Sequence, residues 1–313
     1  MGKTALVFPG QGAQYTGMAR DLYEGNNTAK EIIDRADSVL DFDLKDMMFN
    51  EEKSAELSKT ENTQPAMVTH SIAALEVLKE GSDFKYDACL GLSLGEYAAL
   101  AASKALDFEE AVKLVRKRGM LMSAEVPEGT GAMAAIIGYD REKIEKSISE
   151  IKSGVVEVAN YNSPVQIVIS GEKKAVEEAA EKLKNEGAKK VVMLNVSGPF
   201  HSSLLKGAGE KLAEELKNIE IKDFEVPVVA NVNASYYGEN PKELLVKQVS
   251  NSVLWEDSVS MLMDEGFDRF IEIGPGKTLR AFIKKIASKK GCKVEIINID
   301  TLDSINKFKS EQE

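Results

Sequence analysis

Residues 87–102 read DACLGLSLGEYAALAA, and this stretch contains the pattern that decides the fold. The run from Asp87 to Leu90 is typical of a short buried strand, and the Ala- and Leu-rich run that follows predicts a helix. Between them, residues 91–95 (GLSLG) fit GxSxG, a tight strand-to-helix turn whose glycines allow close backbone approach and whose serine projects outward. The stretch predicts a nucleophilic Ser93, with the backbone N–H of Leu94 facing a developing oxyanion. The alternative is a serine that only caps a helix.

Alternating strand-like and helix-like runs surround this turn. Residues 5–8 predict a buried strand that ends in a Pro and Gly loop, and a helix is expected over 65–78. Further strands are expected within VPVVANV (226–232), FIEIGPG (270–276) and VEIINI (294–299), and residues 301–313 suggest a short polar helix or tail. Strands that alternate with helices imply a mostly parallel sheet covered on both faces, so the fold class is α/β.

The pattern changes in the middle of the chain. Residues 131–196 predict strand, helix, strand, strand, helix, strand, which is the βαββαβ order of a ferredoxin-like subdomain. We therefore predict a discontinuous large α/β catalytic domain formed by residues 1–127 and 201–313, with a ferredoxin-like subdomain at 128–200 inserted between them.

Composition excludes several classes of protein. The 313 residues are 43% hydrophobic and 29% charged, an ordinary globular balance, and the net charge of −11 argues against nucleic acid as a partner. No apolar run approaches the roughly 20 residues of a membrane span, and the N-terminus has no signal-peptide pattern, so a cytoplasmic location is expected. Cys89 and Cys292 lack metal-site spacing, and we expect both to be buried small hydrophobes, with no bound metal.

A serine nucleophile needs a general base, and the chain has two histidines. His70 lies on a predicted helix, where a packed or surface histidine is expected. His201 lies in SGPFHSSLL, at an irregular junction after the predicted insert, and we predict that it is the base. More than a hundred residues follow it and no acid lies near it in sequence, which fits an α/β-hydrolase poorly. A backbone or amide carbonyl is then left to orient the imidazole.

Arg118 is the third candidate, on a helix predicted over residues 107–126. The apolar stripe of that helix runs through Ala111, Leu114, Val115 and Met122, and Arg118 falls at its centre, whereas Arg116 and Lys117 are expected to point away. A guanidinium among core-facing residues must be paired, and its planar fork matches a carboxylate. Periodicity alone leaves two partners open, an internal Asp or Glu and the carboxylate of an acyl group.

Together these residues closely resemble the malonyl-CoA:acyl carrier protein transacylases of fatty acid synthesis. The resemblance runs almost end to end, through FPGQGAQ (8–14), TQPA (63–66), GLSLGEYAAL (91–100), RKRGMLM (116–122), PEGTGAMAAIIG (127–138), NSP (162–164), GPFH (198–201) and IGPGK (273–277). It implies an α/β-hydrolase-like core with a ferredoxin-like subdomain, in agreement with the predicted order of elements. One departure is Leu92, because many members of the family carry histidine at this position.

The resemblance also implies a role for each matching residue. Ser93 is the acylated nucleophile, His201 its base and later acid, and Arg118 the group that binds the malonyl carboxylate. Gln11 supplies the backbone N–H that completes the oxyanion hole with Leu94, and the main-chain carbonyl of Gln248 orients the histidine. Phe200 resembles a bulky residue that disfavours a methyl-branched acyl group.

The implied reaction is malonyl transfer from malonyl-CoA to the phosphopantetheine thiol of acyl carrier protein through a ping-pong cycle, with no cofactor and a monomeric enzyme. A serine hydrolase or thioesterase that uses the same turn is the alternative, and a protein with a vestigial site is a third. Because carrier proteins are acidic, a basic face is expected, with Lys189, Lys190, Lys284, Lys285, Lys289 and Lys290 as candidates. An ordinary solvated surface is the alternative for these lysines.

Overall fold

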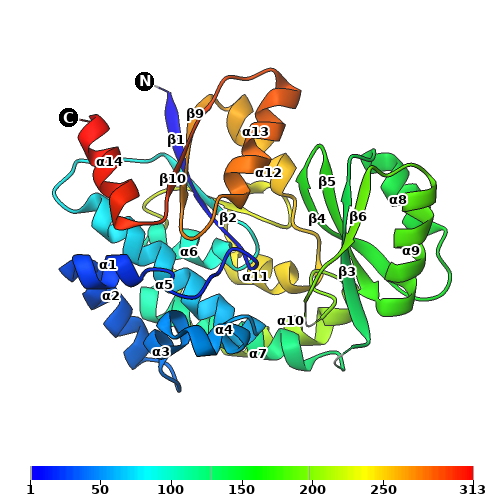
Figure 1. Cartoon of the computed structure of the whole chain (residues 1–313), viewed down its shortest axis with the longest axis horizontal. Coiled ribbons are helices and arrows are strands. Elements are labelled where there is room, and N and C mark those ends of the chain that lie inside the picture. Colours follow the sequence, from blue (N-terminus) through cyan, green and yellow to red (C-terminus); the bar gives the residue numbers. More distant parts are fainter. Residues whose placement is uncertain (1, 128, 197, 313) are drawn as a thin grey trace.

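A six-stranded sheet forms the centre of the large part of the molecule (Figure 1). The computed structural model describes residues 2–127, 129–196 and 198–312. The strand order is β10-β9-β1-β2-β7-β8, and every pairing is parallel except that of β7 with β8. The strands are β1 (Lys3–Phe8), β2 (Ala88–Gly91), β7 (Val228–Ala230), β8 (Ser235–Tyr236), β9 (Phe267–Ile273) and β10 (Glu295–Ile299). The predicted mostly parallel sheet is confirmed.

Both faces of this sheet are buried because its strands are apolar on both sides. In β1, Leu6 and Phe8 belong to one apolar cluster and Ala5 and Val7 to another. The first cluster includes residues of α2 (Asn27–Ser38), α5 (Thr60–Lys79), α6 (Gly95–Ala102), α7 (Phe108–Ala124), α10 (Lys206–Leu216) and α14 (Leu302–Gln312). The second includes residues of α12 (Trp255–Asp264) and α13 (Thr278–Lys290). A strand buried on both faces shows no polar alternation, which is how parallel strands are recognised in a sequence.

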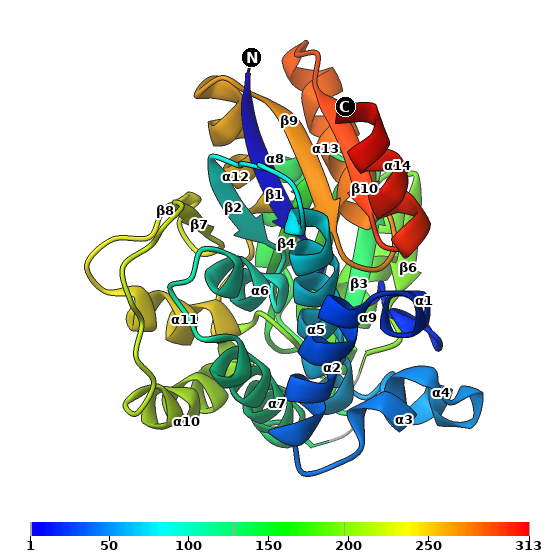
Figure 2. The same cartoon turned by 90° about the vertical axis from the view of Figure 1, so that its left-hand side faces the viewer.

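The remaining helices of the large part are short or lie at its edge. They are α1 (Arg20–Gly25), α3 (Leu44–Phe49), α4 (Ser54–Leu57) and α11 (Pro241–Ser250), with single 3₁₀ turns at Glu51–Lys53 and Ser203–Leu205. The two ends of the chain lie at the same end of the molecule in both views (Figure 1, Figure 2). Along the described residues, no helix combines the length and apolar character that a bilayer crossing needs.

A second, antiparallel sheet stands beside the first (Figure 1). Its order is β4-β5-β3-β6, the ferredoxin-like arrangement, and it is built by β3 (Gly131–Ile137), α8 (Arg141–Ser149), β4 (Val156–Ser163), β5 (Gln166–Glu172), α9 (Lys173–Asn185) and β6 (Lys190–Met193). One face packs on α8 and α9, whereas Met133 and Val168 on the other face join the core of the large part. The predicted boundary at residue 128 lies outside the described residues, and the division into two domains stays a prediction.

Backbone hydrogen bonds join the second sheet to the large part of the molecule at Val253. The N–H of Val253 donates to the carbonyl of Ala159 at 2.8 Å, and the N–H of Tyr161 donates to the carbonyl of Val253 at 3.0 Å. Asn160 forms an isolated parallel bridge with the same residue. Strand β4 is thereby tied to the segment between α11 and α12.

Several details differ from the sequence prediction. The helix expected from residue 65 begins at Thr60, so Pro65 lies inside it. The strand β8 was not predicted, since two residues carry no periodic signal. The C-terminal residues form α14, in which Ile305 and Phe308 are buried. The prediction for Cys292 was wrong, because this residue follows the helix-ending Gly291 and is exposed, whereas Cys89 is buried as expected.

Candidate active site

The turn that carries Ser93 is formed by close contact between backbones. Ser93 lies between β2 and α6 with a positive φ of 54°. A Cβ on Gly91 would lie 1.9 Å from the carbonyl carbon of Gly95, and a Cβ on Gly95 would lie 2.2 Å from the carbonyl oxygen of Phe8. Neither position accepts a side chain, so both glycines of GxSxG are required by packing.

Asn231 holds this turn from the neighbouring strand. It follows β7, and its Oδ1 accepts the N–H of Ser93 at 2.7 Å while its Nδ2 donates to the carbonyl of Gly91 at 2.7 Å. These two bonds fix the backbone on both sides of Leu92. Asn231 was not predicted from the sequence, although a polar residue at the carboxyl end of a predicted parallel strand is a signal for a site.

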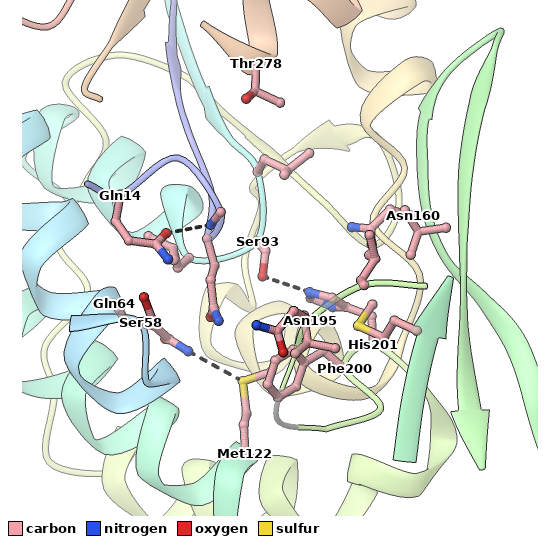
Figure 3. A pocket seen from close by; sticks show the side chains of 18 of the residues that line it. Gln14, Ser58, Gln64, Ser93, Met122, Asn160, Asn195, Phe200, His201 and Thr278 are labelled. Carbon is pink, nitrogen blue, oxygen red and sulfur yellow. Dashed lines mark hydrogen bonds between the residues drawn. The ribbon is translucent and has the colours of Figure 1, made fainter. Parts of the chain in front are cut away.

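Ser93 and His201 form a hydrogen-bonded pair (Figure 3). Ser93 Oγ lies 2.7 Å from His201 Nε2, and His201 Nδ1 lies 2.8 Å from the main-chain oxygen of Gln248. A carbonyl oxygen can only accept, so Nδ1 carries the proton and Nε2 accepts the serine hydroxyl. Burial, and next the positive charge of Arg118, lower the pKa of His201 to about 4, so the imidazole is neutral at pH 7.

Arg118 lies beside this pair, on α7, with 1% of its surface exposed. Its Nη1 donates to Gln64 Oε1 at 2.8 Å, and its Nη2 donates to Gln248 Oε1 at 2.8 Å and to Ser93 Oγ at 3.1 Å. Within the part of the chain that the structure describes, no Asp or Glu forms a salt bridge with it, and its Nε has no hydrogen-bond partner. The internal ion pair that the sequence left open is therefore absent from the described residues.

Arg116 and Lys117, the two cations that precede Arg118 on α7, differ in exposure. Lys117 is exposed, as expected. Arg116 is half-buried, and its Nη1 donates to Asn62 Oδ1 at 2.6 Å while its guanidinium lies over the Phe42 ring. The expectation that Arg116 points away was wrong, because the neighbouring Asn62 and Phe42 cover the edge of the helix.

A buried carboxyl group lies behind Gln248. Glu96, in the first turn of α6, is fully buried, and its Oε2 accepts Gln248 Nε2 at 2.6 Å and the N–H of Asn231 at 3.3 Å. Its Oε1 accepts the hydroxyl of Tyr237. Burial raises the pKa of Glu96 to about 7, and the three hydrogen bonds oppose that rise. Glu96 was not predicted from the sequence.

A cavity of about 760 Å³ opens between the two sheets, and Ser93, Arg118 and His201 line it. Gln11 and Leu94, the two predicted oxyanion donors, also line it, together with Leu92, Phe200 and residues of the second sheet such as Met133 and Val168. Gln11 Nε2 donates to Thr60 Oγ1 at 3.2 Å, and this bond holds the Gln11 side chain against the first residue of α5. This volume is in the range of pockets that bind small molecules.

The remaining candidates lie apart from this cavity. His70 is fully buried and its Nε2 lies 2.9 Å from the main-chain oxygen of Asp300, so the packed interpretation is confirmed. Of the candidate basic residues, Lys289 pairs with Glu256 and Lys290 with Asp264. Across residues 2–127, 129–196 and 198–312, no cluster of His, Cys, Asp and Glu is arranged to hold a metal ion.

Comparison with known proteins agrees with this geometry. The family model for the acyl transferase domain matches residues 5–303. A malonyl CoA-acyl carrier protein transacylase of Staphylococcus aureus (strain MRSA252) is 47% identical over 97% of this chain and 98% of its own length. The Bacillus subtilis (strain 168) protein of the same name is 48% identical over 91% of each chain.

Solved structures with the same fold indicate the same family. A crystal structure of malonyl CoA-acyl carrier protein transacylase from Clostridium perfringens superposes with a TM-score of 0.92 at 42% identity, over 99% of this chain and 97% of that one. A type II PKS acyl-carrier protein in complex with its malonyl-transacylase gives a TM-score of 0.93 at 38% identity, over 97% and 98% of the two chains. Similarity of this extent leads to one assignment: the chain belongs to the acyl transferase family and, within it, to the malonyl CoA-acyl carrier protein transacylases.

Proposed function

We propose that this chain transfers a malonyl group from malonyl-CoA to the phosphopantetheine thiol of acyl carrier protein, through an acyl-enzyme on Ser93. The observation that carries the proposal is the 2.7 Å contact between Ser93 Oγ and the neutral Nε2 of a histidine whose other nitrogen donates to a carbonyl. This is the geometry of a nucleophile with its general base and an orienting group.

In the first half of the cycle, His201 Nε2 accepts the hydroxyl proton while Ser93 Oγ bonds to the thioester carbonyl carbon. The negative charge that develops on the carbonyl oxygen is stabilised by the backbone N–H groups of Gln11 and Leu94. The C–S bond then breaks, and the proton on His201 passes to the sulfur of coenzyme A. In the second half, the carrier-protein thiol gives its proton to His201, its sulfur bonds to the acyl carbon, and Ser93 leaves as the hydroxyl.

Arg118 selects the acyl group in this proposal. A malonyl ester on Ser93 ends in a carboxylate a few bonds from Oγ. Arg118 Nη2 lies 3.1 Å from Ser93 Oγ, so the guanidinium is within reach of that carboxylate. A buried guanidinium with no carboxylate partner among the described residues is suited to an anionic acyl chain. No step needs a metal or a dissociable cofactor.

The proposed reaction also bears on the acyl acceptor, the oligomeric state and the cellular location. One structural relative is an acyl-carrier protein in complex with its malonyl-transacylase, which supports a carrier protein as the second substrate. Ser93, Arg118, His201 and Gln248 all come from one chain, so we expect a monomer to be active. A coenzyme A thioester as donor implies a cytoplasmic location.

Intact-protein mass spectrometry tests this function. Wild-type protein mixed with malonyl-CoA should gain one malonyl group, and holo acyl carrier protein added afterwards should remove it and become malonylated. Ser93→Ala should gain no malonyl group. An adduct that persists in Ser93→Ala would exclude Ser93 as the nucleophile, and free malonate as the main product with carrier protein present would favour a thioesterase.

A further inference from the structure

Gln248 is the residue through which the parts of the site are connected. Its main-chain oxygen accepts His201 Nδ1, its side-chain Oε1 accepts Arg118 Nη2, and its Nε2 donates to the main-chain oxygen of Ser93 at 2.9 Å. The side-chain amide of Gln248 can accept a hydrogen bond from Arg118 in one orientation only. If it were flipped, the NH₂ group would face the N–H groups of the guanidinium, and Oε1 would face the oxygen of Ser93.

Glu96 makes a second contact that distinguishes the two orientations of the Gln248 amide. Its Oε2 accepts Gln248 Nε2 at 2.6 Å, a charge-assisted hydrogen bond when Glu96 is ionised, whereas the oxygen of Ser93 is a neutral acceptor. A flipped amide would place Oε1 against this carboxyl oxygen. Because Glu96 is fully buried, water does not weaken the contact or replace it.

The carboxyl group is itself held firmly. The hydroxyl of Tyr237, the N–H of Asn231 and Nε2 of Gln248 donate to it, so the three hydrogen bonds that it makes with the described residues all come from donors. Glu96 therefore presents acceptors only. It is also the carboxyl group that reaches Arg118 through a single intervening amide, and it touches neither Ser93 Oγ nor His201 in the contacts of the described residues.

We infer that Glu96 is a positioning residue for the acyl carboxylate: it fixes the Gln248 amide with Oε1 toward Arg118, and the guanidinium is thereby aimed at the cavity. This inference rests on the proposed function, because it assigns Glu96 to recognition of the malonyl carboxylate at the same site. A malonyl group depends on the aim of Arg118, whereas an acetyl group has no carboxylate and does not. Loss of Glu96 should therefore lower malonyl transfer selectively.

The test compares kcat/KM for transfer from malonyl-CoA and from acetyl-CoA to holo acyl carrier protein in three variants. Glu96→Leu removes the acceptor, and the malonyl-to-acetyl ratio should fall about tenfold or more. Glu96→Gln keeps an acceptor for Gln248 while its NH₂ group can donate to the Tyr237 oxygen, so the ratio should be restored to within about threefold of wild type. Tyr236→Phe, the matched control, removes a neighbouring hydroxyl that donates to Glu265 and not to Glu96, and the ratio should be unchanged.

Equal losses of malonyl and acetyl transfer in Glu96→Leu would overturn the inference, because they would mean that Glu96 only supports the turn at Ser93. Full retention of both activities in this variant would overturn it as well. If Glu96→Leu is insoluble, Glu96→Asp serves instead, since a side chain shorter by one methylene withdraws the carboxyl group from Gln248, and the same selective loss is expected. Wild-type protein assayed in parallel separates the two levels: absence of malonyl transfer there would refute the proposed function itself.

Discussion

Replacing Arg118 by methionine removes the guanidinium from the cavity while keeping most of the side-chain volume in α7. In the free protein this group donates to Gln64 and Gln248 and has no ion-pair partner among the described residues. It is already buried, at 1% exposure, so its desolvation and its side-chain order are established before the substrate arrives. Most of the energy of a new contact with a carboxylate is then available for binding and catalysis.

The size of the effect follows from the two hydrogen bonds that a guanidinium forms with a carboxylate. Each hydrogen bond to a charged group contributes about 1.5–3 kcal/mol, so the pair contributes about 3–6 kcal/mol. At about 1.4 kcal/mol for each factor of ten, kcat/KM for malonyl transfer should fall by about 10²–10⁴-fold. Acetyl transfer uses no such contact and should stay within about threefold of wild type.

The assay is steady-state transfer to holo acyl carrier protein from malonyl-CoA and from acetyl-CoA. Arg118→Lys should give an intermediate loss with malonyl-CoA, because an ammonium keeps the charge but not the planar fork. Lys117→Met is the matched control, since that lysine is exposed on the same helix and should affect neither substrate. Equal factors for malonyl and acetyl transfer in Arg118→Met would refute the reasoning and make the arginine a structural residue.

The remaining predictions concern the turn and its titration. Gly91→Ala should destabilise or unfold the protein, because its Cβ would lie 1.9 Å from the carbonyl carbon of Gly95, whereas Gly238→Ala has open space and should leave the melting temperature unchanged; equal melting temperatures for the two variants would contradict the tight-turn account. Because the pKa of His201 is lowered to about 4, the base stays neutral well below pH 6.5, and the rate of malonyl adduct formation in rapid-quench mass spectrometry should fall only as pH approaches about 4. A fall centred near pH 6.5 would contradict this. His70 has the same lowered pKa from burial, so its contribution to the free energy of unfolding decreases as pH falls from about 6.5 to about 4, and the stability difference between wild type and His70→Gln, measured by urea unfolding, should shift against the wild type through that window.

Much of the fold was predictable because its strands are either buried on both faces or paired within a short antiparallel unit. The apolar runs of β1 and β9 carry a strong local signal, and the βαββαβ order of residues 131–193 follows from alternating patterns that tertiary contacts do not override. The two-residue strand β8 could not be found in this way, since its existence depends on pairing with β7. Cys292 was mispredicted because burial was inferred from apolar neighbours in sequence rather than from the end of α13.

The site was predictable to the extent that chemistry marked its residues. A GxSxG turn, a scarcity of histidines and an arginine on an apolar stripe identified Ser93, His201 and Arg118 as candidates, but no sequence pattern specifies that they meet within hydrogen-bond distance. Glu96 and Asn231 were missed although each had a signal. Every residue of α6 is buried, and a charged residue in such a helix must be paired.

The backbone hydrogen bonds at Val253 have a consequence for how the protein unfolds. Residues 131–193 form a sheet of their own, yet its strand β4 shares backbone hydrogen bonds with Val253, and one of its faces lies in the core of the larger sheet. Separating the two sheets would expose that apolar face and leave the amide and carbonyl of Val253 without partners. We therefore expect one cooperative melting transition in calorimetry, in which the inserted segment and the chain on either side of it lose structure at the same temperature.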